Sequence, residues 1–265
     1  MKIQAKKSLG QNFLINPHII DKIVSAAEVS KDDIILEVGP GTGNLTMELA
    51  KKAKKVIAVE KDHRLIEYLR EHLNNEHKNI EIIEGDILKM LPDHCSLNSC
   101  GYKIVANIPY YITSHFLRNI LESADWRMAQ PKLIVLTIQK EVAQRIIAKP
   151  PHMNLLALSV QYYSEPEIIG YISKNNFRPV PKVDSAIIRL NPKSEARNLK
   201  QTEEIFKVMR AGFSEKRKQL APMLSKKLGI NKDTVLEAFK KNELKETARA
   251  EELSLNQWQE LAKIL

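Results

Sequence analysis

The stretch IILEVGPGTGNLTMELAKK, residues 34 to 52, decides the fold. An apolar, β-branched run leads into Gly39, Gly41 and Gly43, and a helical pattern follows. A glycine-rich turn between a strand and a helix is typical of a nucleoside-binding βα unit, because glycine lets the backbone turn tightly and approach a ligand closely. Asn44 stands where the dinucleotide-binding pattern has its third glycine. The stretch therefore favours a nucleoside cofactor over NAD.

Strand and helix patterns alternate on both sides of this turn. We predict strands at 34–38, 56–60, 80–84, 102–106 and 133–138, and helices near 44–53, 62–74 and 112–122. Such alternation indicates βαβ units and a parallel sheet covered on both faces. Further on we predict helices at 141–147 and 153–163, and two late strands, 167–172 and 183–190, that pair as a hairpin at the sheet edge.

A polar linker, NPKSEARNLK at 191–200, marks the expected domain boundary. Only helical periods follow it, near 202–213, 216–228, 232–241 and 254–264. Ser254 and Gln257 fit a capping box for the last helix, and Pro222 is expected to break or kink the second. The sequence thus predicts an α/β domain over residues 1–192 and a small all-helical domain over 201–265.

The charge of the chain indicates the class of its partner. The 265 residues include 41 Lys and Arg against 32 Asp and Glu, a net charge of +9, and the last 75 residues carry 16 against 11. The densest basic stretch is 214–227. A basic surface favours a polyanion, with nucleic acid ahead of an anionic membrane.

Several other classes of protein are not expected. No apolar run approaches the roughly 18–20 residues of a membrane span, and the basic start of the chain lacks the apolar core of a signal peptide. We therefore expect a cytoplasmic protein without a membrane partner. Cys95 and Cys100 have no other ligand at metal-binding spacing, so no metal is expected.

Two carboxylates follow successive predicted strands. Glu60 ends the second strand and Asp86 follows the third. Open α/β sheets bind ligands at the carboxyl ends of their strands, where an acidic residue accepts hydrogen bonds from ribose hydroxyls. The pair suits a ribose and an adenine amino group. Alternatively, Asp86 only caps the turn that follows it.

The tetrapeptide Asn107-Ile108-Pro109-Tyr110 closes the fourth strand and is the most specific pattern in the chain. An adenine amino group is a poor nucleophile, since its lone pair is delocalised into the ring. The Asn107 side-chain carbonyl and the Ile108 main-chain carbonyl can accept its two N–H groups, while Pro109 fixes the backbone and Tyr110 offers a stacking face. The alternative is an ordinary turn after a strand.

These residues belong to a longer ordered set: KKSLGQNFL (6–14), EVGPGTGNLT (37–46), NIPY (107–110), IQKEVAQRI (138–146) and FRPVPKVDSA (177–186). In this order they resemble the KsgA-type ribosomal RNA adenine dimethyltransferases. The resemblance covers residues 1–190 and continues more weakly through AGFSEKRKQL (211–220). It implies a Rossmann-like, class I S-adenosylmethionine-dependent methyltransferase domain with a small helical C-terminal domain. The chain departs from many members at Ala221-Pro222, where they keep a polar or basic pair.

The resemblance also implies roles for individual residues. An N-terminal arm, residues 1–16, would close over the cofactor through Asn12 and Leu14. Gly39 and Gly41 would face its methionine part, Glu60 its ribose and Asp86 its adenine. Asn107 would touch both cofactor and target, and Phe177 would stack on the target base opposite Tyr110. RNA would be held by Lys6, Lys7, Arg178, Lys182 and the basic C-terminal helices.

The resemblance implies a defined reaction. The protein would dimethylate N6 of two adjacent adenosines in the 3′-terminal hairpin of 16S rRNA, within the immature small subunit and as a monomer, with S-adenosylmethionine as methyl donor. One alternative is an Erm-type enzyme that dimethylates 23S rRNA. The other is an assembly or transcription factor that uses the same fold without catalysis.

Overall fold

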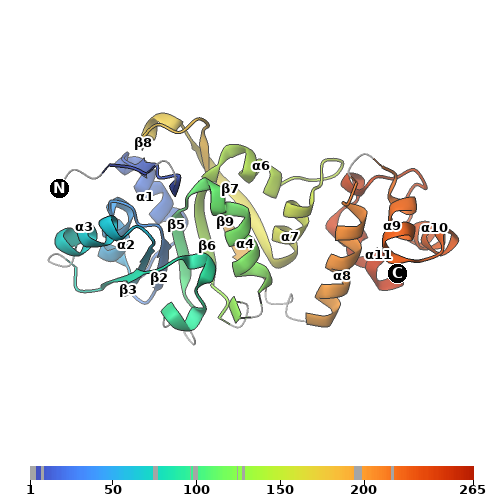
Figure 1. Cartoon of the computed structure of the whole chain (residues 1–265), viewed down its shortest axis with the longest axis horizontal. Coiled ribbons are helices and arrows are strands. Elements are labelled where there is room, and N and C mark those ends of the chain that lie inside the picture. Colours follow the sequence, from blue (N-terminus) through green and yellow to red (C-terminus); the bar gives the residue numbers. More distant parts are fainter. Residues whose placement is uncertain are drawn as a thin grey trace. The chain divides into compact units, whose positions relative to one another are not determined.

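The computed structural model describes residues 4–6, 9–73, 77–95, 97, 101–123, 125–126, 129–193, 199–215 and 218–265 (Figure 1). The chain divides into two compact units. The first comprises 1–143 and 164–192, and the second comprises 144–163 and 193–265. The end of the first unit matches the expected boundary. The segment 144–163 does not, because it belongs to the second unit.

The first unit is built on a seven-stranded sheet in the order β4-β3-β2-β5-β6-β9-β7. The first five strands in this order are parallel, and β9 and β7 are antiparallel to their neighbours. This confirms the predicted α/β sheet with a late hairpin at its edge. The strands are β2 (Ile34–Val38), β3 (Lys55–Glu60), β4 (Ile80–Glu84), β5 (Lys103–Asn107), β6 (Leu133–Gln139), β7 (Ser164–Ile172) and β9 (Ser185–Pro192).

Helices pack on the sheet because the strands are apolar on both faces. The helices of the first unit are α1 (Pro17–Ala26), α2 (Asn44–Lys52), α3 (His63–Leu73), α4 (Thr113–Glu122) and α6 (Lys140–Ile146), the last running into the second unit. Buried residues of α1 and α2 form one core cluster with Ile35, Val105 and Val135 of the sheet. Helix α1 is not among the helices predicted from the sequence, although Asn16 caps it and Pro17 is its first residue.

The order in which strands are added to the sheet reverses between the parallel neighbours β2 and β5. From β2 the chain runs outward through β3 to β4, then returns to β5 beside β2 and runs the opposite way to β6. Right-handed crossovers therefore place α2 and α3 on one face and α4 on the other. Ligands bind in open α/β sheets at such a reversal, outside the carboxyl ends of the strands. The glycine turn follows β2 and Asn107 ends β5, so both lie at this point.

A second, two-stranded sheet lies outside the main one. β1 (Phe13–Leu14) pairs antiparallel with β8 (Phe177–Arg178), with Leu14 opposite Phe177. Two segments far apart in the sequence thus lie side by side (Figure 1). The shortest helical turns are η2 (Ile87–Lys89), η3 (Pro92–Cys95), η4 (Tyr110–Ile112), η5 (Lys174–Asn176) and η6 (Ala250–Glu252).

The second unit is helical. It contains α7 (Leu155–Tyr163), α8 (Leu199–Gly212), α9 (Leu220–Leu228), α10 (Lys232–Lys241) and α11 (Leu255–Ile264). Tyr162 and Tyr163 of α7 contact the ring of Phe206 on α8, and the Met153 amide donates to the carbonyl of Glu251. These contacts explain why 144–163 belongs here. The spacing of apolar residues along the sequence cannot reveal these contacts, because they join residues far apart in the chain.

Two details of the second unit test the sequence predictions. Ser254 and Gln257 form the predicted capping box of α11. The prediction that Pro222 breaks or kinks a helix starting at 216 is wrong, because α9 begins at Leu220 and Pro222 lies in its first turn, where the missing N–H costs no helical hydrogen bond. Within the described residues, no helix is long and apolar enough to span a membrane.

Candidate active site

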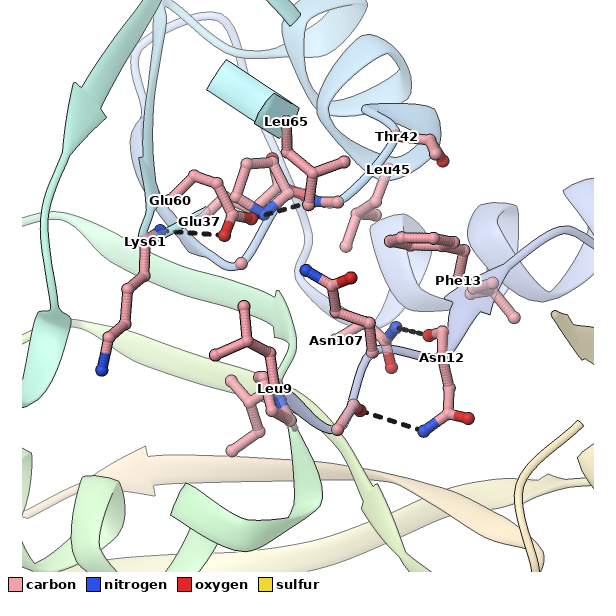
Figure 2. A pocket seen from close by; sticks show the side chains of 18 of the residues that line it. Leu9, Asn12, Phe13, Glu37, Thr42, Leu45, Glu60, Lys61, Leu65 and Asn107 are labelled. Atoms are coloured by element: carbon pink, nitrogen blue, oxygen red, sulfur yellow. Dashed lines mark hydrogen bonds between the residues drawn. The ribbon is translucent and has the colours of Figure 1, made fainter. Parts of the chain in front are cut away.

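A pocket opens at the reversal between β2 and β5 (Figure 2). Most of its walls come from the N-terminal arm, the glycine turn, the end of β3 and the NIPY tetrapeptide, and residues of β2, α2, α3 and η4 complete it. Of the predicted site residues, the structure brings Asn12, Leu14, Gly39, Gly41, Glu60, Asn107, Ile108, Pro109 and Tyr110 to this pocket. Asp86 and Phe177 are not among the residues that line it.

The glycine turn adopts a backbone that requires glycine. Gly41 has a φ of 62°, and a Cβ added to it would lie 2.9 Å from Cδ1 of Phe13. Gly43 has a φ of 83° at the N-cap of α2, where a Cβ would lie 2.9 Å from a Leu73 methyl. Any side chain at either position would be strained and would crowd a neighbour. The turn therefore keeps its backbone exposed to the pocket and the amino end of α2 close to it.

Glu60 ends β3 beside the glycine turn. Its Oε1 accepts from the amides of Lys61 at 2.8 Å and Asp62 at 2.9 Å, and its Oε2 accepts from the Gly41 amide at 3.4 Å. Burial raises the pKa of Glu60 above its ordinary value, although these three amides oppose the shift. The carboxylate is thus fixed against the pocket and retains acceptor capacity for hydroxyl groups.

Asp86 lies on the neighbouring strand end but faces other partners. Its Oδ1 accepts from the Leu88 amide at 3.2 Å, so it caps η2, and its Oδ2 binds Nζ of Lys61 at 2.8 Å. Partial burial raises the pKa of Asp86, but the hydrogen bonds from Lys61 and Leu88 lower it more, and the pKa lies below its ordinary value. Asp86 thus caps the turn, as the alternative requires, and its second oxygen is bound by Lys61, which does line the pocket. The adenine role of Asp86 stays a prediction.

Asn107 lies at the end of β5, opposite Glu60 across the pocket (Figure 2). Its Nδ2 donates to the main-chain carbonyl of Asn12 at 3.2 Å. This bond orients the side-chain amide and leaves Oδ1 available as an acceptor. Pro109 is the N-cap residue of η4, and the Tyr110 hydroxyl lies 2.6 Å from the Ser185 hydroxyl of β9, which fixes the ring.

The N-terminal arm is attached at several points. The Asn44 side chain donates to the Leu14 carbonyl at 2.9 Å, and Asn107 donates to the Asn12 carbonyl as described above. Within the arm, the Asn12 side chain donates to the Gly10 carbonyl at 3.1 Å. Asn44, which replaces the third glycine of the dinucleotide pattern, thus holds the arm. Figure 2 shows Leu9 and Phe13 projecting from the arm at the pocket.

Phe177 is not placed as a stacking residue. Its side chain is 0% exposed and belongs to the core cluster with Leu14, Ile20 and Ile172. The pairing of β1 with β8 buries the ring against the arm. The prediction that Phe177 offers a face opposite Tyr110 is therefore wrong for this structure, since no face of the ring reaches the pocket.

Two residues that line the pocket, Glu37 and Tyr111, were not predicted as site residues from the sequence. Glu37 is 1% exposed, and its Oε2 has no hydrogen-bond partner among the described residues. Burial raises the pKa of Glu37 to about 8, so the neutral acid dominates at pH 7. An acidic residue inside the apolar run before the glycines is the signal that could have revealed it. Tyr111 is 61% exposed beside Tyr110, and an aromatic directly after NIPY was the available signal.

The basic residues expected to hold RNA have different environments. Lys6 binds Asp62, with 3.2 Å between Nζ and Oδ1. Arg178 donates from Nη1 to the carbonyls of Asn175 and Phe177. Lys182 and Lys218 are exposed, whereas Lys7, Lys216 and Arg217 lie outside the described residues.

Comparison with known proteins identifies the family. Residues 2–265 match the family model described as ribosomal RNA adenine dimethylase. The chain belongs to this family. It is 41% identical over 260 residues to the ribosomal RNA small subunit methyltransferase A of Dehalococcoides mccartyi (strain CBDB1), covering 98% of this chain and 88% of the relative. It is 40% identical to the protein of the same name from Clostridium botulinum (strain Okra / Type B1), covering 97% and 92%.

Solved structures support the same family and fold. A dimethyladenosine transferase from Plasmodium falciparum aligns with a TM-score of 0.78 at 29% identity, covering 94% of this chain and 95% of that one. The 23S rRNA methyltransferase ErmE aligns with a TM-score of 0.76 at 29% identity, covering 96% and 99%. The chain therefore has the Rossmann-like methyltransferase fold of the ribosomal RNA adenine dimethylases.

Proposed function

We propose that the protein dimethylates N6 of two adjacent adenosines in the 3′-terminal hairpin of small-subunit (16S) rRNA, with S-adenosylmethionine as the methyl donor. The observation that carries the proposal is the meeting of Asn107, the glycine turn and Glu60 in one pocket at the strand reversal. The proposed substrate is the immature small subunit, and the protein acts on it as a monomer in the cytoplasm.

The residues of the pocket fit the proposed cofactor. Glu60 presents a fixed carboxylate to the ribose hydroxyls. Oε2 of Glu37 is buried and has no partner among the described residues, so it can accept from the ammonium group of the methionine part, whose charge would favour the ionised carboxylate. Gly39 and Gly41 let the backbone approach this part closely. The adenine amine binds Asp86 only if it replaces Lys61, which now holds that carboxylate. When bound, the cofactor supplies a methyl group on an already activated sulfonium.

Asn107 performs the central step on the target base. Because its Nδ2 donates to the Asn12 carbonyl, its Oδ1 accepts an N–H of the target amine, and the Ile108 carbonyl accepts the other. Holding both N–H groups directs the nitrogen lone pair at the methyl group, so catalysis comes from alignment and fixed dipoles. The amine proton leaves to solvent after transfer.

The target adenine must leave its stack to reach Asn107. Tyr110, fixed through Ser185, offers a stacking face inside the pocket. Tyr111 is the exposed aromatic beside it, and Phe177 can take part only if the arm moves away from β8. Stacking of one base on an aromatic side chain contributes about 1–3 kcal/mol. Exposed basic residues such as Lys182 and Lys218 contact phosphates around the target.

The identity of the rRNA rests on the curated relatives. A large-subunit enzyme, ErmE, shares this fold, so the fold alone does not separate the two substrates. The relatives at about 40% identity carry small-subunit names, which favours the small subunit. The intact pocket argues against a purely structural role in assembly.

A methyl-transfer assay tests the proposal. The protein is incubated with methyl-labelled cofactor and either immature small subunits or protein-free large-subunit rRNA, with Asn107→Ala as the inactive control. We expect label at two neighbouring adenosines of the small-subunit RNA and none on the large-subunit RNA. Label on the large-subunit RNA alone would make the chain an Erm-type enzyme, and no label on either RNA would contradict the proposed activity.

A further inference from the structure

Three consecutive residues at the end of β3 bind three different segments around the pocket. Glu60 accepts from the glycine turn, Lys61 binds Asp86 beyond β4, and Asp62 binds the N-terminal arm. The backbone amide of Asp62 donates to Glu60 at 2.9 Å, so the residue that contacts the arm is also bonded to the carboxylate at the pocket. The arm is therefore connected directly to the cofactor side of the site.

Asp62 is 3% exposed and binds four side-chain donor groups. Nε and Nη2 of Arg64 donate to it at 3.1 and 2.7 Å. From the arm, Lys6 Nζ donates at 3.2 Å and Gln11 Nε2 at 3.0 Å. The Asp62 side chain is buried while its two cationic partners, Lys6 and Arg64, are 45% and 39% exposed. The buried carboxylate is a strong anchor, because its desolvation is compensated only while these donors stay bound to it.

The arm residues that Asp62 binds form a closed turn. The Leu9 amide donates to the Lys6 carbonyl at 3.1 Å, and the Lys6 amide donates to Oε1 of Gln11 at 2.7 Å. The turn carries Leu9 and Gly10 to the pocket wall. The next attachments along the arm are the bond from Asn107 to the Asn12 carbonyl and the two-residue strand β1. Among the described residues, Asp62 thus anchors the side chains of Lys6 and Gln11 on the body of the domain.

We propose that Asp62 is a positioning residue for the cofactor: through Lys6 and Gln11 it holds residues 9–11 of the arm against the pocket, so that cofactor affinity depends on a residue that does not itself line the pocket. The inference rests on the proposed use of this pocket for S-adenosylmethionine. Loss of the anchor frees the segment and adds the entropy of ordering it to the cost of cofactor binding.

The test compares Asp62→Asn with a matched control. Asparagine preserves the size and one acceptor but removes the charge. Asp33→Asn is the control, because Asp33 is also a partly buried carboxylate, 2.9 Å from Lys103 Nζ, at the amino ends of β2 and β5 and away from the pocket. In the cofactor-free protein, we expect hydrogen exchange at the amides of residues 9–14 to accelerate at least tenfold in Asp62→Asn, while the control matches wild type.

Equilibrium binding of S-adenosylmethionine gives the second measurement. We expect about tenfold or greater weakening in Asp62→Asn and less than twofold change in the control. Gln11→Ala removes one contact from the arm side, leaves the body of the domain intact, and should show the same two effects to a smaller degree. Combined with Asp62→Asn it should add little, because both act through one contact network.

The outcomes separate this inference from the proposed function. Wild type that binds no S-adenosylmethionine would contradict the proposed function, while hydrogen exchange still tests the anchor. If the wild-type protein binds S-adenosylmethionine, and Asp62→Asn and Gln11→Ala bind it with the same affinity, the inference is overturned. Equal weakening in Asp62→Asn and Asp33→Asn would also overturn it, since general destabilisation would then be the cause. If Asp62→Asn does not fold, Lys6→Ala decides in the same two measurements, because Lys6 is the other arm partner of Asp62 and, unlike Gln11, does not line the pocket.

Discussion

Replacement of Phe177 by alanine tests whether this ring belongs to the core. The side chain is 0% exposed and packs with Leu14 and Ile172 in the cluster that joins the arm to the sheet. Removal of a fully buried phenylalanine ring costs about 3–5 kcal/mol in lost transfer energy and residual cavity. Phe177→Leu, which preserves most of the volume, should cost less than about 1.5 kcal/mol.

The assay is urea denaturation followed by tryptophan fluorescence. Trp126 lies in the same unit and Trp258 in the other, and both are buried, so a Trp258→Phe background assigns the signal to the methyltransferase unit. The alanine variant should lose 3–5 kcal/mol, as estimated above, of the free energy of unfolding of this unit. A loss below about 1 kcal/mol, together with a large rise in the KM for RNA, would refute the reasoning and restore Phe177 as a stacking residue.

Three further variants test the pocket. Because folding raises the pKa of Glu37 from 4.5 to about 8, the folded state retains a proton that the unfolded chain releases, and stability falls as pH rises through this window. The free energy of unfolding of wild type should therefore fall by up to about 1.4 kcal/mol per pH unit relative to Glu37→Gln between pH 5 and 8, and equal slopes in urea titrations would contradict this. Glu60→Ala should weaken the binding of S-adenosylmethionine by roughly 1.5–3 kcal/mol, measured by calorimetry, and leave the affinity for RNA unchanged. Asn107→Ala should slow single-turnover methylation at saturating cofactor and RNA by about a hundredfold or more. A near-wild-type rate would mean that residues 107–110 are an ordinary turn without a catalytic role.

The sequence determined the parts of this protein that depend on neighbouring residues. The predicted strands 34–38 and 80–84 match β2 and β4, and the Ser254–Gln257 capping box forms as expected. Glycine turns, β-branched runs and caps act over a few residues, so their patterns persist whatever the rest of the chain does. For the same reason the glycine turn, Glu60 and NIPY could be assigned to strand ends, and the sheet topology then brought them into one pocket.

Only the tertiary structure decided which side chains face that pocket. Phe177 is buried because β8 pairs with β1, one oxygen of Asp86 is occupied because Lys61 binds it, and Asp62 is an anchor because Lys6 and Gln11 reach it. The same holds for α7, which joins the second unit through Phe206 of α8. Each of these facts depends on contacts between residues distant in the chain. Periodicity and spacing describe only local geometry, so exposure and partner choice are fixed when separate segments pack against each other.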